Sequence, residues 1–331
     1  MQRIVTQYSG PDRRRPVLII QHAPHEHPAA LRRALQTQGI QSLWLHPYRG
    51  EPYPAIANIR GVISLGGPMG ANDQAHHPWI EAECALLKQA VEAGLPVAGI
   101  CLGGQLLAKA LGGRVEKSPA AELGWFPILL NETGTGDRVL GSAGQNPLVY
   151  HWHMDTFHLP PGAELLASSG GCARQAYRIG DRVYGFQFHP EADHQLVHEW
   201  LEHSGIEQEI EDEQTLHGAE TVQTADQMRE HAARGERGSL KITAGIGQLF
   251  KVRDYEDIGA EATSLIETFT THRWEVAVEL QGPDRQDFTL IGTIVTLLSI
   301  PDGEFMILRD RDTLLWPIRL DYAKKITLVS R

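Results

Sequence analysis

Several features that would place a protein outside the ordinary globular class are scarce in this chain of 331 residues. Its three cysteines, Cys84, Cys101 and Cys172, are an odd number without C-x-x-C spacing, so neither a disulfide framework nor a cysteine-rich zinc site is expected. The longest apolar stretch, Thr289–Ile300, falls well short of the ~20 residues that span a bilayer. We therefore expect no membrane partner, and any cysteine with a chemical role must act alone.

Basic residues are also fewer than acidic residues. The 30 Lys and Arg face 41 Asp and Glu, a net charge of −11, which argues against a surface that neutralises the phosphates of nucleic acid. Small molecules or proteins are the expected partners, with no nucleic acid. No secretory signal is recognisable, so a cytoplasmic location is expected. The length predicts about two domains, and the balance of 42% hydrophobic and 21% charged residues is that of a globular protein.

Short apolar runs alternate with segments of helical periodicity in the first part of the chain. Strands are predicted at Val17–Gln21, Gly61–Leu65 and Pro96–Ile100, and helices at Pro28–Gln38 and Trp79–Ala93. This alternation predicts an α/β fold with a doubly wound parallel sheet and helices on both faces. Reactive side chains then belong at the carboxyl ends of the strands, where the loops form a crevice.

The pattern of the chain changes near Val252. Between residues 207 and 236, nine acidic residues face two basic ones, which we interpret as a solvated helical face. After Val252 strand-like runs dominate, with Gly-Pro-Asp and Pro-Asp-Gly turns between some of them. These runs are Glu275–Leu280, Phe288–Leu298, Glu304–Leu308, Leu314–Ile318 and Lys325–Val329. They predict a small β-barrel or sheet.

Cys101 lies in a turn with the layout of a nucleophile elbow. An apolar strand runs into Gly99-x-Cys101-x-Gly103, and an Ala/Leu-rich helix follows. The glycines let the backbone turn sharply, while the N-terminus of the helix stabilises a thiolate and offers N–H groups to an oxyanion. The alternative is a buried structural cysteine beside glycines that only allow close packing.

A base for this thiol is offered by His189-Pro190-Glu191, which follows the strand-like run Val183–Phe188. A thiol nucleophile needs an imidazole base and a group that orients it, usually a carboxylate. If the two strands are parallel neighbours, His189 and Glu191 leave the sheet at the same edge as Cys101. A third strand leads into Gly66-Gly67-Pro68, whose backbone N–H groups suit an oxyanion hole, although such a sequence alone is only a turn.

Five separated motifs occur in the order found in class I glutamine amidotransferases, and the chain resembles the standalone, GMP-synthase-like branch of that family. They are Gly66–Met69, Gly99–Gln105, Glu122–Trp125, Trp152–Asp155 and Gly185–Glu191. The resemblance runs from about residue 17 to 250 and implies a flavodoxin-like doubly wound sheet with a helical tail. It therefore implies an amidotransferase-like domain at residues 1–252, followed by a small β-barrel domain at residues 253–331.

By that resemblance, Cys101 attacks the side-chain amide of glutamine or of another γ-glutamyl compound, and a γ-glutamyl thioester forms that water resolves. His189 acts as base and then as acid, and Glu191 orients it. The N–H groups of Gly67 and Leu102 hold the oxyanion. No cofactor is implied. The residues expected to bind the substrate are Gly66, Pro68, Gln105, Trp152, His153 and Asp155.

Two features leave the substrate and the fate of the ammonia open. Met154 stands where many relatives have glycine in W-H-G-D, which would narrow or reshape the glutamyl pocket. No G-x-x-x-x-G-K-[ST] phosphate loop is present, so a separate synthase uses the ammonia or the enzyme simply hydrolyses γ-glutamyl compounds. The alternative enzyme is a γ-glutamyl peptidase specific for a larger conjugate.

Residues 254–329 weakly resemble the Rho-binding antiterminator (Rof) family, which has an Sm-like small barrel. Residues 253–331 hold nine basic and fourteen acidic residues, a balance unsuited to RNA phosphates and better suited to a basic protein surface. A third hypothesis is therefore a protein-binding regulator that acts through this acidic barrel. The remaining alternative is a domain that packs against the first or mediates self-association.

Closely spaced histidines raise the question of a metal site. They form two groups, His22, His25 and His27, and His151, His153 and His158. We predict no metal, because His153 is accounted for by the glutamyl-pocket motif and no carboxylate or cysteine completes a convincing ligand set.

Overall fold

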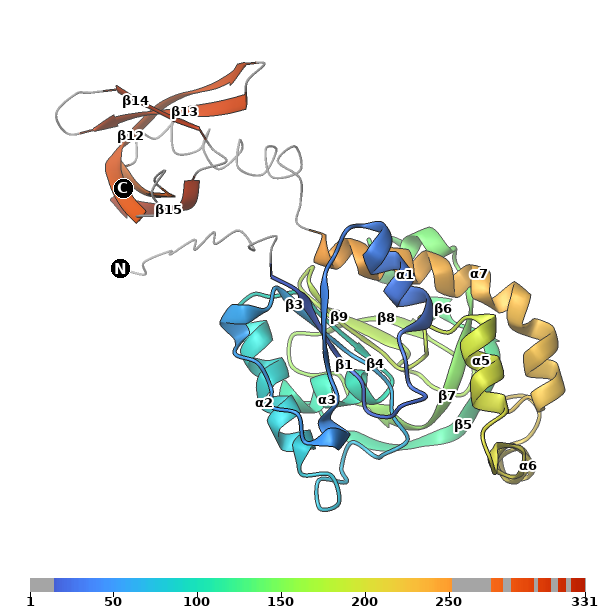
Figure 1. Cartoon of the computed structure of the whole chain (residues 1–331). Coiled ribbons are helices and arrows are strands. Elements are labelled where there is room, and N and C mark those ends of the chain that lie inside the picture. Colours follow the sequence, from blue (N-terminus) through green and yellow to red (C-terminus); the bar gives the residue numbers. More distant parts are fainter. Residues whose placement is uncertain are drawn as a thin grey trace. The chain divides into compact units, whose positions relative to one another are not determined.

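The structure is a computed structural model that describes residues 15–251 and five strand segments between residues 275 and 330. The chain divides into two compact units (Figure 1). One spans Arg13–Lys251, and the five later strands belong to the other. Among the described residues, no helix combines the length and hydrophobicity of a membrane span.

An eight-stranded mixed sheet forms the centre of the first unit, in the order β2-β1-β3-β4-β10-β9-β8-β6. The first five of these strands run parallel, in the order typical of flavodoxin-like folds, which confirms the predicted α/β class. They are β2 (Ser42–Leu45), β1 (Val17–Ile20), β3 (Gly61–Ser64), β4 (Val97–Ile100) and β10 (Val183–Phe186). The antiparallel strands are β9 (Ala176–Ile179), β8 (Glu164–Ser168) and β6 (Leu129–Leu130).

The antiparallel extension corrects the prediction of a purely parallel sheet. Only Gly180, Asp181 and Arg182 separate β9 from β10, and a parallel pair would need a crossover of a dozen or more residues. The two strands must therefore pair antiparallel, and Val183 lies opposite Ile179.

Alternate residues of β1 bury their side chains on opposite faces of the sheet. Val17 and Ile19 belong to the core shared with α1 and α7, whereas Leu18 and Ile20 belong to the core shared with α2 and α3. Figure 1 shows the two helix pairs on the two sides of the sheet. All four strand residues are fully buried, and each such side chain stabilises the fold by about 1.5–3 kcal/mol. The helices are α1 (Ala29–Thr37), α7 (Ala225–Phe250), α2 (Trp79–Glu92) and α3 (Leu102–Ala110).

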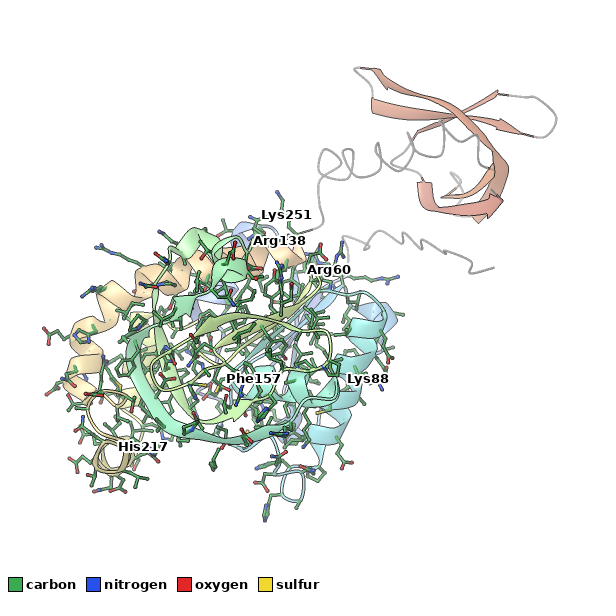
Figure 2. The ribbon with its side chains drawn as sticks, turned by 180° about the vertical axis from the view of Figure 1, so that it is seen from behind. Arg60, Lys88, Arg138, Phe157, His217 and Lys251 are labelled. Atoms are coloured by element: carbon green, nitrogen blue, oxygen red, sulfur yellow. The ribbon has the colours of Figure 1, made fainter. Side chains whose placement is uncertain are left out.

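A long two-stranded ribbon, β5 (Val115–Pro127) paired with β7 (Leu148–Phe157), forms a second layer. Its core contains large aromatic side chains and residues of α5 (His194–Leu201) and α6 (Ile206–His217). The short helix α4 (Glu132–Thr135) lies between the two strands of the ribbon in the sequence. In Figure 2 Phe157, at the end of β7, lies inside the unit, while His217, at the end of α6, lies at its periphery.

The acidic stretch falls on α6 and the first half of α7. Most of its carboxylates are exposed and the rest are partly buried, which confirms the predicted solvated helical face. Helix α7 begins with a capping box, in which the Thr224 side chain accepts from Gln227 N at 3.3 Å and Gln227 Oε1 accepts from Thr224 N at 2.9 Å.

The second unit contains an antiparallel sheet in the order β14-β13-β12-β11-β15. Each strand lies where the sequence predicts one. The strands are β11 (Glu275–Gln281), β12 (Asp287–Ile300), β13 (Gly303–Asp310), β14 (Leu315–Arg319) and β15 (Ala323–Ser330). The turns predicted at residues 282–284 and 301–303 lie wholly or partly outside the described residues. The Sm-like barrel and the likeness to the Rof family stay predictions.

We expect Gly235→Ala to destabilise the first unit, although alanine favours a helix. A Cβ at Gly235, on the buried face of α7, would lie 2.0 Å from Trp125 Cε3, so the ring or the helix must move. Such overpacking costs about 1–3 kcal/mol and lowers Tm by roughly 2–4 °C per kcal/mol. Ala233→Gly on the exposed face of α7 is the control, because it loses only helix propensity, about 1 kcal/mol. A Gly235→Ala protein as stable as wild type in thermal denaturation would contradict this packing.

Candidate active site

Cys101 occupies a strained turn between β4 and α3. Its φ of 49° and ψ of −109° lie in a region that costs a residue with a side chain about 1–3 kcal/mol. Neighbouring strands hold the turn, since Cys101 N donates to Phe186 O at 2.8 Å and Gly103 N donates to Leu65 O at 3.0 Å. Position 103 must be glycine, because a Cβ there would lie 2.1 Å from Ser64 O. The sharp turn that the sequence predicts is therefore present.

His189 and Glu191 follow β10, the parallel neighbour of β4, and so leave the sheet at the same edge as Cys101. His189 Nδ1 donates to Glu191 Oε1 at 2.8 Å, and both side chains are buried. Burial alone would lower the pKa of His189, but the charges of Glu191 and Cys101 and hydrogen bonds to both side chains raise it well above its usual value. The structure therefore brings the three side chains together and favours an imidazolium beside the thiol.

Two backbone N–H groups are available for an oxyanion. In the part of the chain that the structure describes, the N–H groups of Gly67 and Leu102 donate to no acceptor. Gly67 follows β3, which pairs with β4, and Leu102 opens α3 directly after Cys101. An N–H group from each side of a nucleophile is the arrangement that stabilises a tetrahedral oxyanion.

A buried ion pair fixes the loop that carries Gly67. His22 Nδ1 donates to Gly66 O at 2.9 Å, and its Nε2 lies 3.0 Å from Glu83 Oε2. Burial alone would lower the pKa of His22, but Glu83 raises it above its usual value, so both ring nitrogens donate. Ser64 Oγ donates to Glu83 at 2.6 Å, and the His22 ring stacks on Trp79. The sequence suggested His22 only as a candidate metal ligand and gave no sign of its ion pair with Glu83.

A cavity of about 650 Å³ opens above Cys101 and His189. It is lined by Gly67 and Leu102, by Met154, and by all but one of the predicted substrate-binding residues, namely Pro68, Gln105, Trp152, His153 and Asp155. The exception is Gly66, which lies behind the lining, beside His189. The cavity is also lined by residues that were not predicted from the sequence, among them Glu26, Lys117, Trp200 and Glu209.

Polar groups surround the thiol. Cys101 Sγ lies 3.7 Å from Trp152 O and 3.9 Å from Gln187 Nε2. Gln187 in turn accepts from Gln105 Nε2 at 3.3 Å, so the predicted pocket residue Gln105 is linked to the thiol through a second amide. On the cavity wall, Lys117 Nζ lies 2.9 Å from Asp155 Oδ1.

Comparison with known proteins decides the family. Residues 29–208 match the glutamine amidotransferase class-I family. The chain belongs to this family. It is 35% identical over 217 residues to the glutamine amidotransferase-like protein YfeJ of Salmonella typhimurium, a match that covers 64% of this chain and 89% of that protein. The crystal structure of a glutamine amidotransferase from Methylobacillus flagellatus superposes with a TM-score of 0.64 at 33% identity, covering 71% of this chain and 94% of the other.

In a larger relative, the similarity covers only a segment of the protein. The glutamine-hydrolysing GMP synthase of Aeropyrum pernix is 35% identical over 158 residues, which are 46% of this chain and 28% of that protein. The matched segment therefore spans little more than a quarter of that relative.

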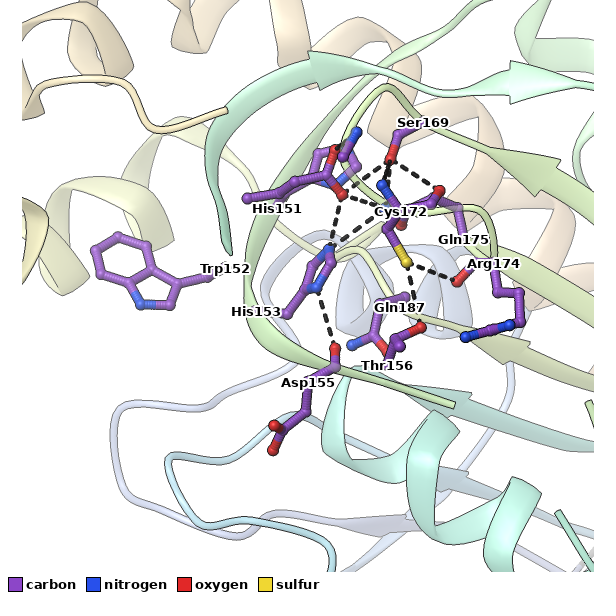
Figure 3. Close-up of polar contacts among 12 residues, drawn as sticks. His151, Trp152, His153, Asp155, Thr156, Ser169, Cys172, Arg174, Gln175 and Gln187 are labelled. Atoms are coloured by element: carbon purple, nitrogen blue, oxygen red, sulfur yellow. Dashed lines mark hydrogen bonds and ion pairs between the residues drawn. The ribbon is translucent and has the colours of Figure 1, made fainter. Parts of the chain in front are cut away.

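A buried polar cluster lies behind the pocket wall of this amidotransferase (Figure 3). Glu122 Oε2 accepts from Gln175 Nε2 at 2.6 Å and from Ser169 Oγ at 2.9 Å, and it lies 3.2 Å from His153 Nε2. Burial would raise the pKa of Glu122, but His153, His151 and Ser169 lower it to about 2. Figure 3 shows Trp152 on the opposite side of the strand from His153. His153 both lines the cavity and contacts Glu122, so it connects the cavity to this cluster.

The cluster corrects one step of the metal argument. Ligand atoms of Glu122, His151 and His153 lie within 4.8 Å of one another, so the expectation that no carboxylate joins these histidines is wrong. Both Glu122 oxygens already accept protein hydrogen bonds, Oε1 from Gly171 N at 3.1 Å and Oε2 from the groups named above. Hydrogen bonding accounts for this carboxylate without a metal.

We expect Glu191→Gln to slow alkylation of Cys101. Loss of the carboxylate lowers the pKa of His189, so less imidazolium stabilises the thiolate at pH 7. One pKa unit corresponds to a tenfold change in the thiolate fraction, so alkylation should slow about tenfold. Iodoacetamide labelling followed by peptide mass spectrometry measures the rate. Cys84, whose pKa burial raises to about 11, is a slow internal standard, and Glu209→Gln in the same cavity is the matched control. Equal rates in wild type and Glu191→Gln would contradict the charge coupling.

We expect the neutral His151 to make the fold sensitive to acid. Burial lowers its pKa to about 4, although Glu122 opposes this. Below pH ~6.5 the His151 ring takes up a proton in the unfolded chain but stays neutral in the folded chain. The free energy of unfolding therefore falls as the pH drops toward 4. Between pH 7 and pH 5 wild type should lose about 2 kcal/mol more than His151→Phe in urea denaturation. His198→Phe, which removes an exposed imidazole, is the control. Parallel stability curves for wild type and His151→Phe would contradict a buried neutral ring.

Proposed function

We propose that this amidotransferase hydrolyses the γ-amide of glutamine or of a related γ-glutamyl compound, with Cys101, His189 and Glu191 as a catalytic triad. One observation carries the proposal. A strained turn presents a lone thiol to a cavity beside an imidazole whose Nδ1 donates to a buried carboxylate at 2.8 Å. This arrangement activates a nucleophile for acyl transfer.

The reaction follows from these positions. Cys101 Sγ attacks the γ-carbonyl carbon, and the N–H groups of Gly67 and Leu102 receive the oxyanion. The C–N bond breaks as His189 Nε2 gives its proton to the leaving nitrogen, which leaves a γ-glutamyl thioester. His189 then removes a proton from water, the thioester is hydrolysed, and glutamate is released.

The charged groups on the cavity wall suit the α-carbon of a glutamyl group. Asp155 and Lys117, which pair at 2.9 Å, offer a carboxylate to the α-ammonium and an ammonium to the α-carboxylate. Gln105, Trp152 and the other predicted binding residues on this wall complete the glutamyl site in this proposal.

For the released ammonia we propose a separate synthase as acceptor. The chain carries no phosphate loop, and its GMP synthase relative contains much more than the matched segment. For the second unit we propose a basic protein partner, since acidic residues outnumber basic ones by fourteen to nine over residues 253–331.

The size of the cavity favours a second candidate, a γ-glutamyl peptidase that acts on a larger conjugate. About 650 Å³ lies within the ~300–1,000 Å³ typical of sites for drug-sized ligands and exceeds the needs of a single amino acid. Met154, which lines the cavity in place of a glycine found in many relatives, would then shape the pocket for that conjugate.

Release of ammonia or amine and of glutamate from glutamine and from a panel of γ-glutamyl amides tests both candidates. We expect wild type to turn over at least one of them and Cys101→Ala to lose about 10³-fold or more of kcat, because the covalent route is closed. Cys84→Ala, the same substitution at a cysteine outside the cavity, should keep the activity. Turnover of glutamine supports an ammonia donor, and turnover of conjugates alone supports the peptidase. Equal activity of Cys101→Ala and wild type would overturn the proposed triad.

A further inference from the structure

The oxyanion hole of the proposed mechanism depends on one peptide group, the one that joins Gly66 to Gly67. Its N–H belongs to Gly67, which lines the cavity, and donates to no acceptor among the described residues. Its carbonyl belongs to Gly66, which lies behind the lining. The peptide bond is trans, and a trans peptide group is planar with its C=O and N–H pointing in opposite directions. A contact that holds the carbonyl therefore also directs the N–H.

Glycine flanks this peptide group on both sides, and packing requires both glycines. A Cβ at Gly66 would lie 2.8 Å from His189 Cε1, and a Cβ at Gly67 would lie 2.8 Å from Leu102 Cδ2. Without a Cβ on either side, the peptide group can turn over at little conformational cost. A turned peptide group would direct its carbonyl where the N–H had been and remove the oxyanion donor. An active site built on two glycines therefore needs a contact from outside the loop.

His22, in the loop after β1, supplies that contact from a ring that is itself fixed. Its Nδ1 donates to Gly66 O at 2.9 Å. On the other side of the ring, Nε2 lies 3.1 and 3.0 Å from the two carboxylate oxygens of Glu83, and the ring stacks on Trp79 with the centroids 5.0 Å apart. Glu83 accepts a further hydrogen bond from Ser64 Oγ of β3 at 2.6 Å. The ring therefore cannot turn without breaking a buried ion pair.

We propose that His22 is a positioning residue, whose Nδ1 holds the carbonyl of Gly66 so that the N–H of Gly67 stays directed at the oxyanion. This inference rests on the proposed function. His22 does not line the cavity, and it takes part in no proton transfer. As Cys101 Sγ bonds to the γ-carbonyl carbon, one electron pair of the C=O bond moves to the oxygen. An N–H group that is already fixed receives this charge without reorganisation.

The ion pair with Glu83 also strengthens the oxyanion donor. Burial alone would lower the pKa of His22, but the charge of Glu83, its hydrogen bond and the backbone oxygen of Gly66 raise it. A charged donor forms a stronger hydrogen bond than a neutral one. A peptide group whose carbonyl accepts such a bond is polarised, so its own N–H becomes the better donor. The same contact thus orients the N–H of Gly67 and strengthens its hydrogen bond to an oxyanion.

Two amide substitutions separate the roles of the two ring nitrogens. Asparagine Nδ2 lies as many bonds from Cβ as histidine Nδ1, and glutamine Nε2 as many as histidine Nε2. His22→Asn therefore keeps a donor for Gly66 O, whereas His22→Gln keeps one for Glu83 alone. The substrate is glutamine, or γ-glutamyl p-nitroanilide if wild type does not turn over glutamine. We expect His22→Gln to lower kcat about 10–100-fold with KM within about threefold, and His22→Asn to lower kcat less than about fivefold.

Two controls separate the oxyanion hole from the rest of the site. Alkylation of Cys101 by iodoacetamide forms no oxyanion, so its rate should stay within about threefold of wild type in both His22 variants. His46→Gln is the matched substitution at a second histidine that pairs with a glutamate, Glu51, and that lies outside the cavity. It should keep the kcat of wild type.

The outcomes separate this inference from the proposed function. Equal losses of kcat in His22→Asn and His22→Gln would overturn it, as would an unchanged kcat in His22→Gln. Alkylation slowed as much as kcat would also overturn it, because His22 would then act through the thiol. If His22→Gln shows no thermal unfolding transition, the double variant His22→Leu/Glu83→Leu leaves no unpaired buried charge, and a wild-type kcat there would overturn the inference. A wild-type protein inactive on both substrates would instead contradict the proposed function.

Discussion

The site depends on the backbone contacts that hold Cys101 in its strained turn. Three adjacent parallel strands, β3, β4 and β10, supply them: Phe186 O accepts from the Cys101 N–H, and Ser64 O lies so close to Gly103 that a side chain there is impossible. The strain costs about 1–3 kcal/mol. Burial of even one large strand residue contributes a similar amount, so the sheet readily maintains the turn. Because the same strands lead into Gly67 and His189, the packing that strains the thiol also aligns its partners.

His22, His189 and His151 are all buried, but they differ in their distance to a carboxylate and in the direction in which their pKa shifts. His22 and His189 each lie within hydrogen-bond distance of a glutamate, at 3.0 and 2.8 Å, and the pKa of each ring is raised despite its burial. The nearest carboxylate oxygen to His151 is 3.7 Å away, and burial prevails there, lowering the pKa to about 4. A difference of less than an ångström thus accompanies a raised pKa for the ring beside Cys101 and a lowered pKa for His151.

Local signals in the sequence made it predictable that Cys101 and His189 lie close together, whereas contacts between distant loops were not predictable. Cys101 and His189 stand directly after strands and beside glycine or proline, so strand periodicity alone predicts that they meet at one sheet edge. Glu83 lies in the middle of a predicted helix, and nothing in its neighbourhood signals that its carboxylate is fully buried against His22. The antiparallel edge of the sheet was missed for a related reason, because the length of one connection, rather than the apolar pattern, sets the strand direction.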